Sequence, residues 1–240
     1  MTEGKPRKTI ASVKKAIDVI NYLSESEDNL GVTEISEGLG MGVSATYHLL
    51  NTLRESNIID QDEKTKKFKL SLRLWQIGMS AYEKNPISMI LNPYLKRLKE
   101  ITGETTNLTI LDEDHIVYVA QEESDKAIKM FTQIGASAPL HCTGGGKVLL
   151  AYQNKKKRNA IIDKLDLVRY TKNTITKKDE LIQKLEEIRE RGYGFDEEER
   201  NQDVFCIGAP VFGVKDKVVA CISISGPKSR FTEDTIKIWV

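Results

Sequence analysis

Residues 31–53 of this 240-residue chain read GVTEISEGLGMGVSATYHLLNTL. The first part of this stretch has the apolar spacing of a short helix, for which Thr33 is the expected N-cap. The glycine-rich residues 38–42 are too flexible to continue that helix, so they predict a tight turn. Ser44 is the expected N-cap of a second helix, which extends to Ser56 and carries a stripe of leucines. Two helices joined by such a turn are typical of a helix-turn-helix.

The flanking segments extend this pattern to a winged helix-turn-helix over residues 12–71. A helix with Ser12 as its N-cap is expected first, and its buried face is predicted to consist of Val13, Ala16, Ile17, Ile20 and Leu23. After the second helix, Ile58-Ile59 and residues 68–70 read as two short strands around the polar hairpin DQDEKTKK. Helix, short helix, turn, helix and hairpin is the order of elements in a winged helix-turn-helix.

The charge of the chain is balanced, with 36 Lys and Arg against 35 Asp and Glu. Residues 1–75 are balanced as well, with eleven of each kind. This excludes a polycationic coat protein, so a nucleic-acid role depends on where the charges lie. Basic residues gather in an arm over residues 1–11 and in the predicted wing, Lys64–Lys69. A helical domain for protein contacts is the alternative interpretation of this module.

Two surfaces of the module are expected to contact double-stranded DNA. Reading the major groove requires short polar groups and a few longer donors near the N-terminus of a recognition helix. The second helix offers Ser44, Ala45, Tyr47, His48 and Asn51 for that purpose. The wing offers Lys64, Lys66 and Lys67, whose ammonium groups can reach phosphates without reading the sequence.

The rest of the chain predicts a linker helix over residues 72–85 and an α+β domain over residues 86–240. Pro86 suits the first turn of a helix in which Pro93 is expected to introduce a kink. Strands are predicted over residues 105–111, 116–121 and around 128–132, helices over 144–152, 155–165 and 178–191, and a closing hairpin over 204–213 and 218–227. Hairpin connections favour an antiparallel sheet flanked by helices.

Composition places the chain among globular cytoplasmic proteins. Hydrophobic residues make up 40% and charged residues 30%, which is too apolar for a disordered chain. The first residues lack the apolar region of a secretory signal, and the longest uncharged stretch is too polar to cross a membrane. The three cysteines, Cys142, Cys206 and Cys221, are too few for a disulfide framework and indicate a reducing compartment.

Thr143-Gly144-Gly145-Gly146-Lys147 leads into a predicted helix and is the most distinctive segment of the second domain. Free backbone N–H groups at a helix N-terminus attract anions, and glycines let a ligand approach closely. The segment is not a nucleotide P-loop, because Val148 replaces the hydroxyl residue that would bind magnesium. A close contact between helix and strand is the alternative reading of these glycines.

Several motifs resemble those of the IclR-type transcription regulators. They are SVKKAIDVINYL, GVTEISEGLGM, SATYHLLNTL and FKLSLRLWQIG in the first half, and GASAPLHCTGGGKVLLA, RERGYGFDEEER, CIGAPVFG and VVACISISGPKSRFT in the second. The resemblance runs from about Ser12 to the end of the chain. It implies a winged helix-turn-helix joined by a linker helix to a GAF-like effector domain. Regulators of this type bind operator DNA as homodimers or dimers of dimers. Many of them repress transcription under the control of a small metabolite.

The chain departs from the family pattern in two places. The recognition helix has Ser44-Ala45 and His48 where the family usually carries Ser-Thr and then Arg, so a strong phosphate or guanine contact is missing. The chain also ends at Trp239-Val240, where the resemblance implies a longer closing helix.

The resemblance also implies an effector pocket for a small keto, hydroxy or sugar acid, and no cofactor or metal. Its residues correspond here to Met130, Gly144, Gly145, Asp196, Cys206, Ser223 and Ser225. Ser223 and Ser225 lie two apart on one strand, so both hydroxyls face the same side and can hold a carboxylate with the Gly144 and Gly145 amides. An ionised Asp196 would repel an anion, so this carboxyl is expected to be protonated or to accept from a ligand hydroxyl.

A thiol- or metabolite-dependent enzyme with an accessory DNA-binding module is the alternative from another class. Its nucleophile would be Cys142 beside His141, or Cys206 with His115. Adjacent residues on a strand point to opposite faces, so His141 is poorly placed to activate Cys142. Convergence of His141, Cys206 and Asp196 on a metal stays open at this point.

Overall fold

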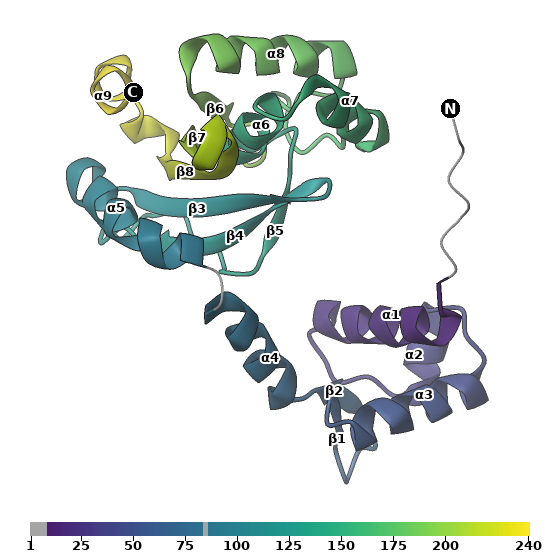
Figure 1. Cartoon of the computed structure of the whole chain (residues 1–240). Helices are drawn as coiled ribbons and strands as arrows, with labels where there is room; N and C mark the ends of the chain where they lie inside the picture. Colours follow the sequence, from purple (N-terminus) through teal and green to yellow (C-terminus); the bar gives the residue numbers. More distant parts are fainter. Residues whose placement is uncertain (1–8, 84–85) are drawn as a thin grey trace. The chain divides into compact units, whose positions relative to one another are not determined.

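The computed structural model describes residues 9–83 and 86–240, which form two compact units on either side of residues 84–85 (Figure 1). Residues 1–8 of the predicted basic arm and the last two residues of the predicted linker helix lie outside the described residues. No helix in the described part of the chain has both the length and the apolar character needed to cross a membrane.

The first unit has the order of elements predicted for a winged helix-turn-helix. It contains α1 (Ala11–Glu25), α2 (Val32–Gly38), α3 (Val43–Glu55), β1 (Ile59–Gln61), β2 (Phe68–Leu70) and α4 (Leu72–Glu83). In the turn between α2 and α3, Gly40 has a φ of +60°, which glycine adopts without steric cost. The β1–β2 hairpin pairs Ile59 with Leu70, and Leu30 forms a further antiparallel bridge to Phe68.

The predicted N-caps of the first three helices are each wrong by two residues. α1 begins after Ile10 and α3 after Gly42, so Ser12 and Ser44 lie inside the first turn and their side chains cap nothing. α2 begins after Gly31, whose N–H donates to the Glu34 carboxylate at 2.5 Å, so the carboxylate replaces the expected Thr33 hydroxyl. Because glycine is also tolerated at the N-cap, a nearby serine does not fix where a helix begins.

The core of the first unit joins α1, α2 and α3 to the hairpin. Its buried members are Val19, Leu23, Ile35, Leu50, Leu53, Ile59 and Phe68. Two members of the predicted buried face of α1 lie outside it, since Val13 is 56% and Ile17 50% exposed. α1 buries Val19 and Leu23, one helical turn apart, and Ala16 and Ile20 pack partly buried against the same core, so the buried face keeps three residues of the predicted stripe and adds Val19.

The second unit is the predicted α+β domain. It contains α5 (Pro86–Thr102), β3 (Thr105–Asp112), β4 (His115–Glu122), β5 (Ser137–Pro139), α6 (Gly144–Ala151), α7 (Lys155–Lys164), α8 (Lys178–Arg191), β6 (Gly194–Glu197), β7 (Val204–Phe212), β8 (Val218–Pro227) and α9 (Glu233–Trp239). Within the described residues, six of these strands form one antiparallel sheet in the order β5-β4-β3-β8-β7-β6. Pro93 lies inside α5, which continues to Thr102.

The strand predicted around Ile128–Thr132 is wrong. This segment is a loop, and the strand that pairs with β4 is the later and shorter β5. Side chains rather than a neighbouring strand satisfy its carbonyls, since Thr105 Oγ1 donates to the Met130 oxygen at 2.9 Å and Arg230 to the Ile128 oxygen at 3.0 Å. An apolar run alone does not distinguish such a loop from a short strand.

The two faces of the sheet are covered by different helices (Figure 1). Leu95 of α5 packs with Leu108 of β3 on one face. Thr109, the next residue along β3, approaches α6 on the other face, where a Cβ on Gly145 would lie 2.8 Å from the Thr109 hydroxyl. α6, α7 and α8 share a core with Cys221 of β8, and this side of the sheet carries the polar residues described next.

Candidate functional site

Three neighbouring strands align polar residues across the face of the sheet that α6 covers. Asp196 of β6 is paired with Cys206 of β7, and Cys206 with Ser225 of β8. Ser223 lies two residues before Ser225 and is paired with Gly208. Because alternate residues of a strand face the same side, these side chains lie together beneath the N-terminus of α6.

A cavity of about 310 Å³ opens between this row of residues, the start of α6 and the loop after β4. All seven residues singled out from the sequence as effector-binding line it, namely Met130, Gly144, Gly145, Asp196, Cys206, Ser223 and Ser225. The Gly144 turn and the Ser223–Ser225 strand therefore share one cavity. A volume of this size lies at the lower end of the range for small-molecule sites.

The glycines at the start of α6 also serve close packing. A Cβ on Gly145 would lie 2.8 Å from the Thr109 hydroxyl and one on Gly146 would lie 2.7 Å from the Leu140 backbone, whereas a Cβ on Gly144 would make only ordinary van der Waals contact. The helix is capped by the side chain of Thr143, whose hydroxyl accepts from the Gly146 N–H at 3.2 Å. The two readings of this segment are compatible, because the same absence of side chains permits contact with the sheet and leaves helix-terminal amides at the cavity wall.

Ser225 is oriented by a polar network behind the cavity wall. Its hydroxyl oxygen accepts from the Asn107 amide at 3.3 Å, and the Asn107 oxygen in turn accepts from Gln121 at 3.0 Å and from Thr132 at 2.7 Å. This contact uses a lone pair of the serine oxygen, so the hydroxyl keeps its own proton, which it can donate to the neighbouring Cys206 sulfur or to an anionic group in the cavity.

The carboxyl of Asp196 is buried and has a perturbed pKa. Its Oδ1 accepts from the backbone N–H of Glu199 at 2.7 Å and from that of Arg200 at 3.4 Å. Burial raises the pKa of Asp196 to about 7, and the nearby Lys147 charge opposes this rise without cancelling it. Near neutral pH the Asp196 carboxyl is therefore present in both protonated and ionised forms.

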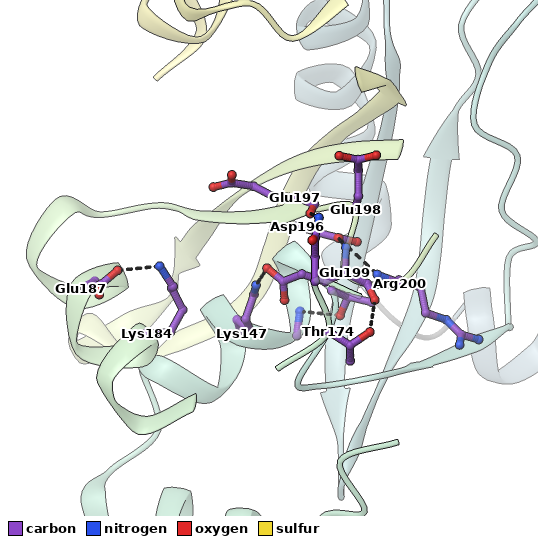
Figure 2. Close-up of polar contacts among 12 residues, drawn as sticks. Lys147, Thr174, Lys184, Glu187, Asp196, Glu197, Glu198, Glu199 and Arg200 are labelled. Carbon is purple, nitrogen blue, oxygen red and sulfur yellow. Dashed lines mark hydrogen bonds and ion pairs between the residues drawn. The ribbon is translucent and has the colours of Figure 1, made fainter. Parts of the chain in front are cut away.

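A buried ion pair lies next to Asp196 (Figure 2). Lys147, which is fully buried in α6, donates to Glu199 Oε1 just after β6. Burial also raises the pKa of Glu199. The other carboxylate oxygen, Glu199 Oε2, is buried and has no hydrogen-bond partner among the described residues. The pair fixes the start of α6 to the segment that carries Asp196.

The structure adds cavity residues that the sequence reasoning missed. They include Thr109, Tyr118, Phe131, Thr132, Arg200 and Asn201. Arg200 is the most informative of them, because its guanidinium lies 3.8 Å from the centroid of the Tyr170 ring. Arg200 is the last residue of the motif RERGYGFDEEER, directly after its acidic residues, and this position could have indicated a role in the pocket. The sequence analysis took only Asp196 from this motif.

The thiols of this unit are poor nucleophiles. Burial raises the pKa of Cys142 and of Cys221 to about 12, and that of Cys206 even further. The His141 ring is held by a 3.0 Å contact to the Val168 oxygen, and burial lowers its pKa. Across residues 9–83 and 86–240, no cluster of three or more His, Cys, Asp or Glu side chains is arranged to hold a metal ion.

In the first unit, α3 has one buried face and one exposed face. Thr46, Leu50 and Leu53 are buried. The exposed residues include Ser44, Ala45, Tyr47 and His48 from the predicted DNA-contact set. Asn51 differs from them, because it is half-buried and its Oδ1 atom has no partner among the described residues.

The predicted wing lysines differ among themselves. Lys64 and Lys66 are exposed in the turn between β1 and β2. Lys67 is half-buried and forms an ion pair of 3.6 Å with Glu34 of α2. Part of its charge is therefore already balanced within the protein.

A winged helix-turn-helix with one face of α3 exposed, joined to a second unit that contains a cavity lined by polar and apolar residues, defines a two-module DNA-binding regulator. Comparison with known families agrees with this class. Residues 12–63 match the IclR helix-turn-helix domain, and residues 79–240 match the family described as bacterial transcriptional regulator IclR C-terminal. The chain belongs to the IclR family of transcription regulators.

Individual relatives support this assignment. The chain is 34% identical to the HTH-type transcriptional regulator KdgR of Escherichia coli over 97% of its own length and 88% of that protein. It is 31% identical to the HTH-type transcriptional repressor AllR of Escherichia coli over 95% of the chain and 84% of that protein. The crystal structure of Thermotoga maritima IclR superposes with a TM-score of 0.72 at 30% identity, covering 96% of this chain and 93% of that one. These relatives are transcription regulators, which decides against the enzyme alternative.

Proposed function

We propose that this regulator is a repressor whose operator binding is controlled by a small organic acid in the cavity of the second unit. The observation that carries the proposal is that seven residues chosen from the sequence line one cavity of about 310 Å³. Two of them are neutral hydroxyl donors, Ser223 and Ser225, and two are glycines at a helix N-terminus, which is a set suited to an anion. The name of the relative AllR supports repression.

On the DNA side, we propose that α3 reads the major groove with Ser44, Ala45, Tyr47, His48 and Asn51. The exposed positions on this face match the part of a recognition helix that reaches base edges. Lys64 and Lys66 are proposed to contact phosphates, with a smaller contribution from the paired Lys67. Homodimers or dimers of dimers are the proposed functional assembly.

The test is a mobility shift on DNA upstream of the gene and its neighbours, with and without candidate keto, hydroxy and sugar acids. We expect Ser223→Ala combined with Ser225→Ala to abolish the response to an acid while operator affinity changes little. Ser229→Ala is the matched control, because Ser229 is exposed and does not line the cavity. A double variant that responds like the wild type would place the effector elsewhere.

A further inference from the structure

The lining of the cavity carries very little formal charge. Among the described residues that line it, Asp196 is the only one with a carboxyl group and Arg200 the only one with a basic side chain. Arg200 is thus the one cation on this wall in the described part of the chain. An anion that enters the cavity meets neutral donors at the start of α6 and a full positive charge at Arg200.

The charge of Arg200 is not neutralised by the neighbouring acids. The described residues form no ion pair with its guanidinium, while Lys147 is paired with Glu199 and Lys228 with Glu198. Figure 2 shows the Arg200 side chain extending away from Asp196 and Glu199. The Tyr170 ring, 3.8 Å from the guanidinium carbon, orients this group by a cation–π contact and leaves its N–H donors free for a ligand.

Arg200 and the glycine turn lie at different ends of the cavity. Gly144, Gly145, Ser223 and Ser225 are buried. Arg200 is half-buried, and it and the exposed Asn201 also line an adjoining surface hollow of about 390 Å³. The neutral donors therefore form the inner end of the cavity, and Arg200 stands at its solvent side.

We propose that Arg200 makes this cavity a site for diacids, in which one carboxylate meets the inner donors and a second carboxylate meets the Arg200 guanidinium. The proposal rests on the effector function proposed above and specifies its ligand class. A second carboxylate loses its hydration on entry, and a guanidinium can replace that hydration with two parallel hydrogen bonds. Placing it at Arg200 also keeps it at the open side, away from the buried carboxyl of Asp196.

The experiment compares two five-carbon 2-keto acids by isothermal titration calorimetry of the full chain. 2-Oxoglutarate has a second carboxylate where 2-oxopentanoate has a methyl group, so the pair isolates that group. In the wild type we expect 2-oxoglutarate to bind about tenfold to a hundredfold more tightly, the range for a charge-assisted hydrogen-bonded pair. In Arg200→Met we expect this preference to disappear while 2-oxopentanoate binds as before.

Arg189→Met is the matched control, because Arg189 also lies over a tyrosine ring, that of Tyr152, and does not line the cavity. It should keep the diacid preference, and Arg200→Lys should keep part of it. Thermal melting of each variant shows that it is folded. Equal binding of the two acids by the wild type, with binding still sensitive to Ser223→Ala and Ser225→Ala, would overturn the diacid proposal alone. Absence of Ser223- and Ser225-sensitive binding of either acid would overturn the effector cavity itself.

Discussion

At the scale of single residues, Asp196 couples the stability of the second unit to pH. Burial raises its pKa in the folded protein from the ordinary 3.8 to about 7. Between these two values the folded chain binds more protons than the unfolded chain, so stability falls as pH rises through this window. Asp196→Asn removes the titration and keeps an oxygen that can accept from the Glu199 N–H. We expect the wild type to lose on the order of 4 kcal/mol more than this variant between pH 4 and pH 8.

The measurement is urea unfolding of both proteins at several pH values. The buried Glu199 also titrates and raises the pKa of Asp196, so the difference between the two curves reports Asp196 together with its effect on Glu199. Asp163→Asn, which changes an exposed aspartate of α7, is the control and should follow the wild type. Parallel curves for wild type and Asp196→Asn would show that the Asp196 carboxyl titrates alike in the folded and unfolded chains.

At the residue level, spacing could predict which side chains share a face of the sheet. Ser223 and Ser225 lie two apart on one regular strand, so both face the same side, whereas Cys206 of the neighbouring strand was placed with them only by the family resemblance. Arg200 follows the end of β6 in a turn, where spacing does not determine the direction of a side chain. Its contact with Tyr170 joins residues thirty positions apart in the sequence, which no local pattern reports.

At the scale of elements, we expect the lysines of the β1–β2 wing to contribute unequally to DNA binding. Each phosphate contact that is lost should flatten the salt dependence of DNA binding by about one unit of slope. We expect Lys64→Ala combined with Lys66→Ala to flatten it by about two and to weaken binding evenly across sequences. Lys67→Ala should have a smaller effect, because the Lys67 ammonium is already paired with Glu34.

Fluorescence anisotropy over a series of salt concentrations, on operator and unrelated DNA, measures both slopes. A change in sequence preference in the Lys64 and Lys66 variant would mean that the wing reads bases. A Lys67→Ala effect equal to that of Lys66→Ala would mean that the Glu34 pair opens on DNA.

The identity and order of most elements could be predicted from the sequence, but some of their limits could not. Helix α8 was predicted with its observed bounds because its apolar period ends at Gly192, which adopts the left-handed conformation of a C-cap. The starts of α1, α2 and α3 were misplaced because backbone and carboxylate contacts, rather than the nearest hydroxyl residue, determine them. The segment around Ile128–Thr132 was misread because its partners are distant side chains.

At the scale of the whole molecule, the proposed function requires that acid binding by the second unit and DNA binding by the first are energetically coupled. A ligand shifts an equilibrium only by the difference between its affinities for the two states. If an acid in the cavity weakens operator binding by some factor, operator DNA must weaken binding of that acid by the same factor. This reciprocity holds for any arrangement of the units, but it applies to the total coupling: in an assembly with several acid sites on one operator, the operator factor is the product of the factors measured for each acid site.

We therefore expect the factor for operator binding to equal the per-site factor for acid binding raised to the number of acid sites in the DNA-bound assembly. With 2-oxoglutarate as the probe, the affinity for an operator fragment is measured by anisotropy with and without saturating acid, and the affinity for the acid by calorimetry with and without saturating DNA. A factor of about 5 to 150 is expected in each case, because allosteric couplings are typically 1–3 kcal/mol. Light scattering must give the same oligomeric state in all four samples. A factor of one in both directions would show that this acid binds without regulating, whereas factors that break this relation with a constant assembly would mean that the acid also acts through a second site.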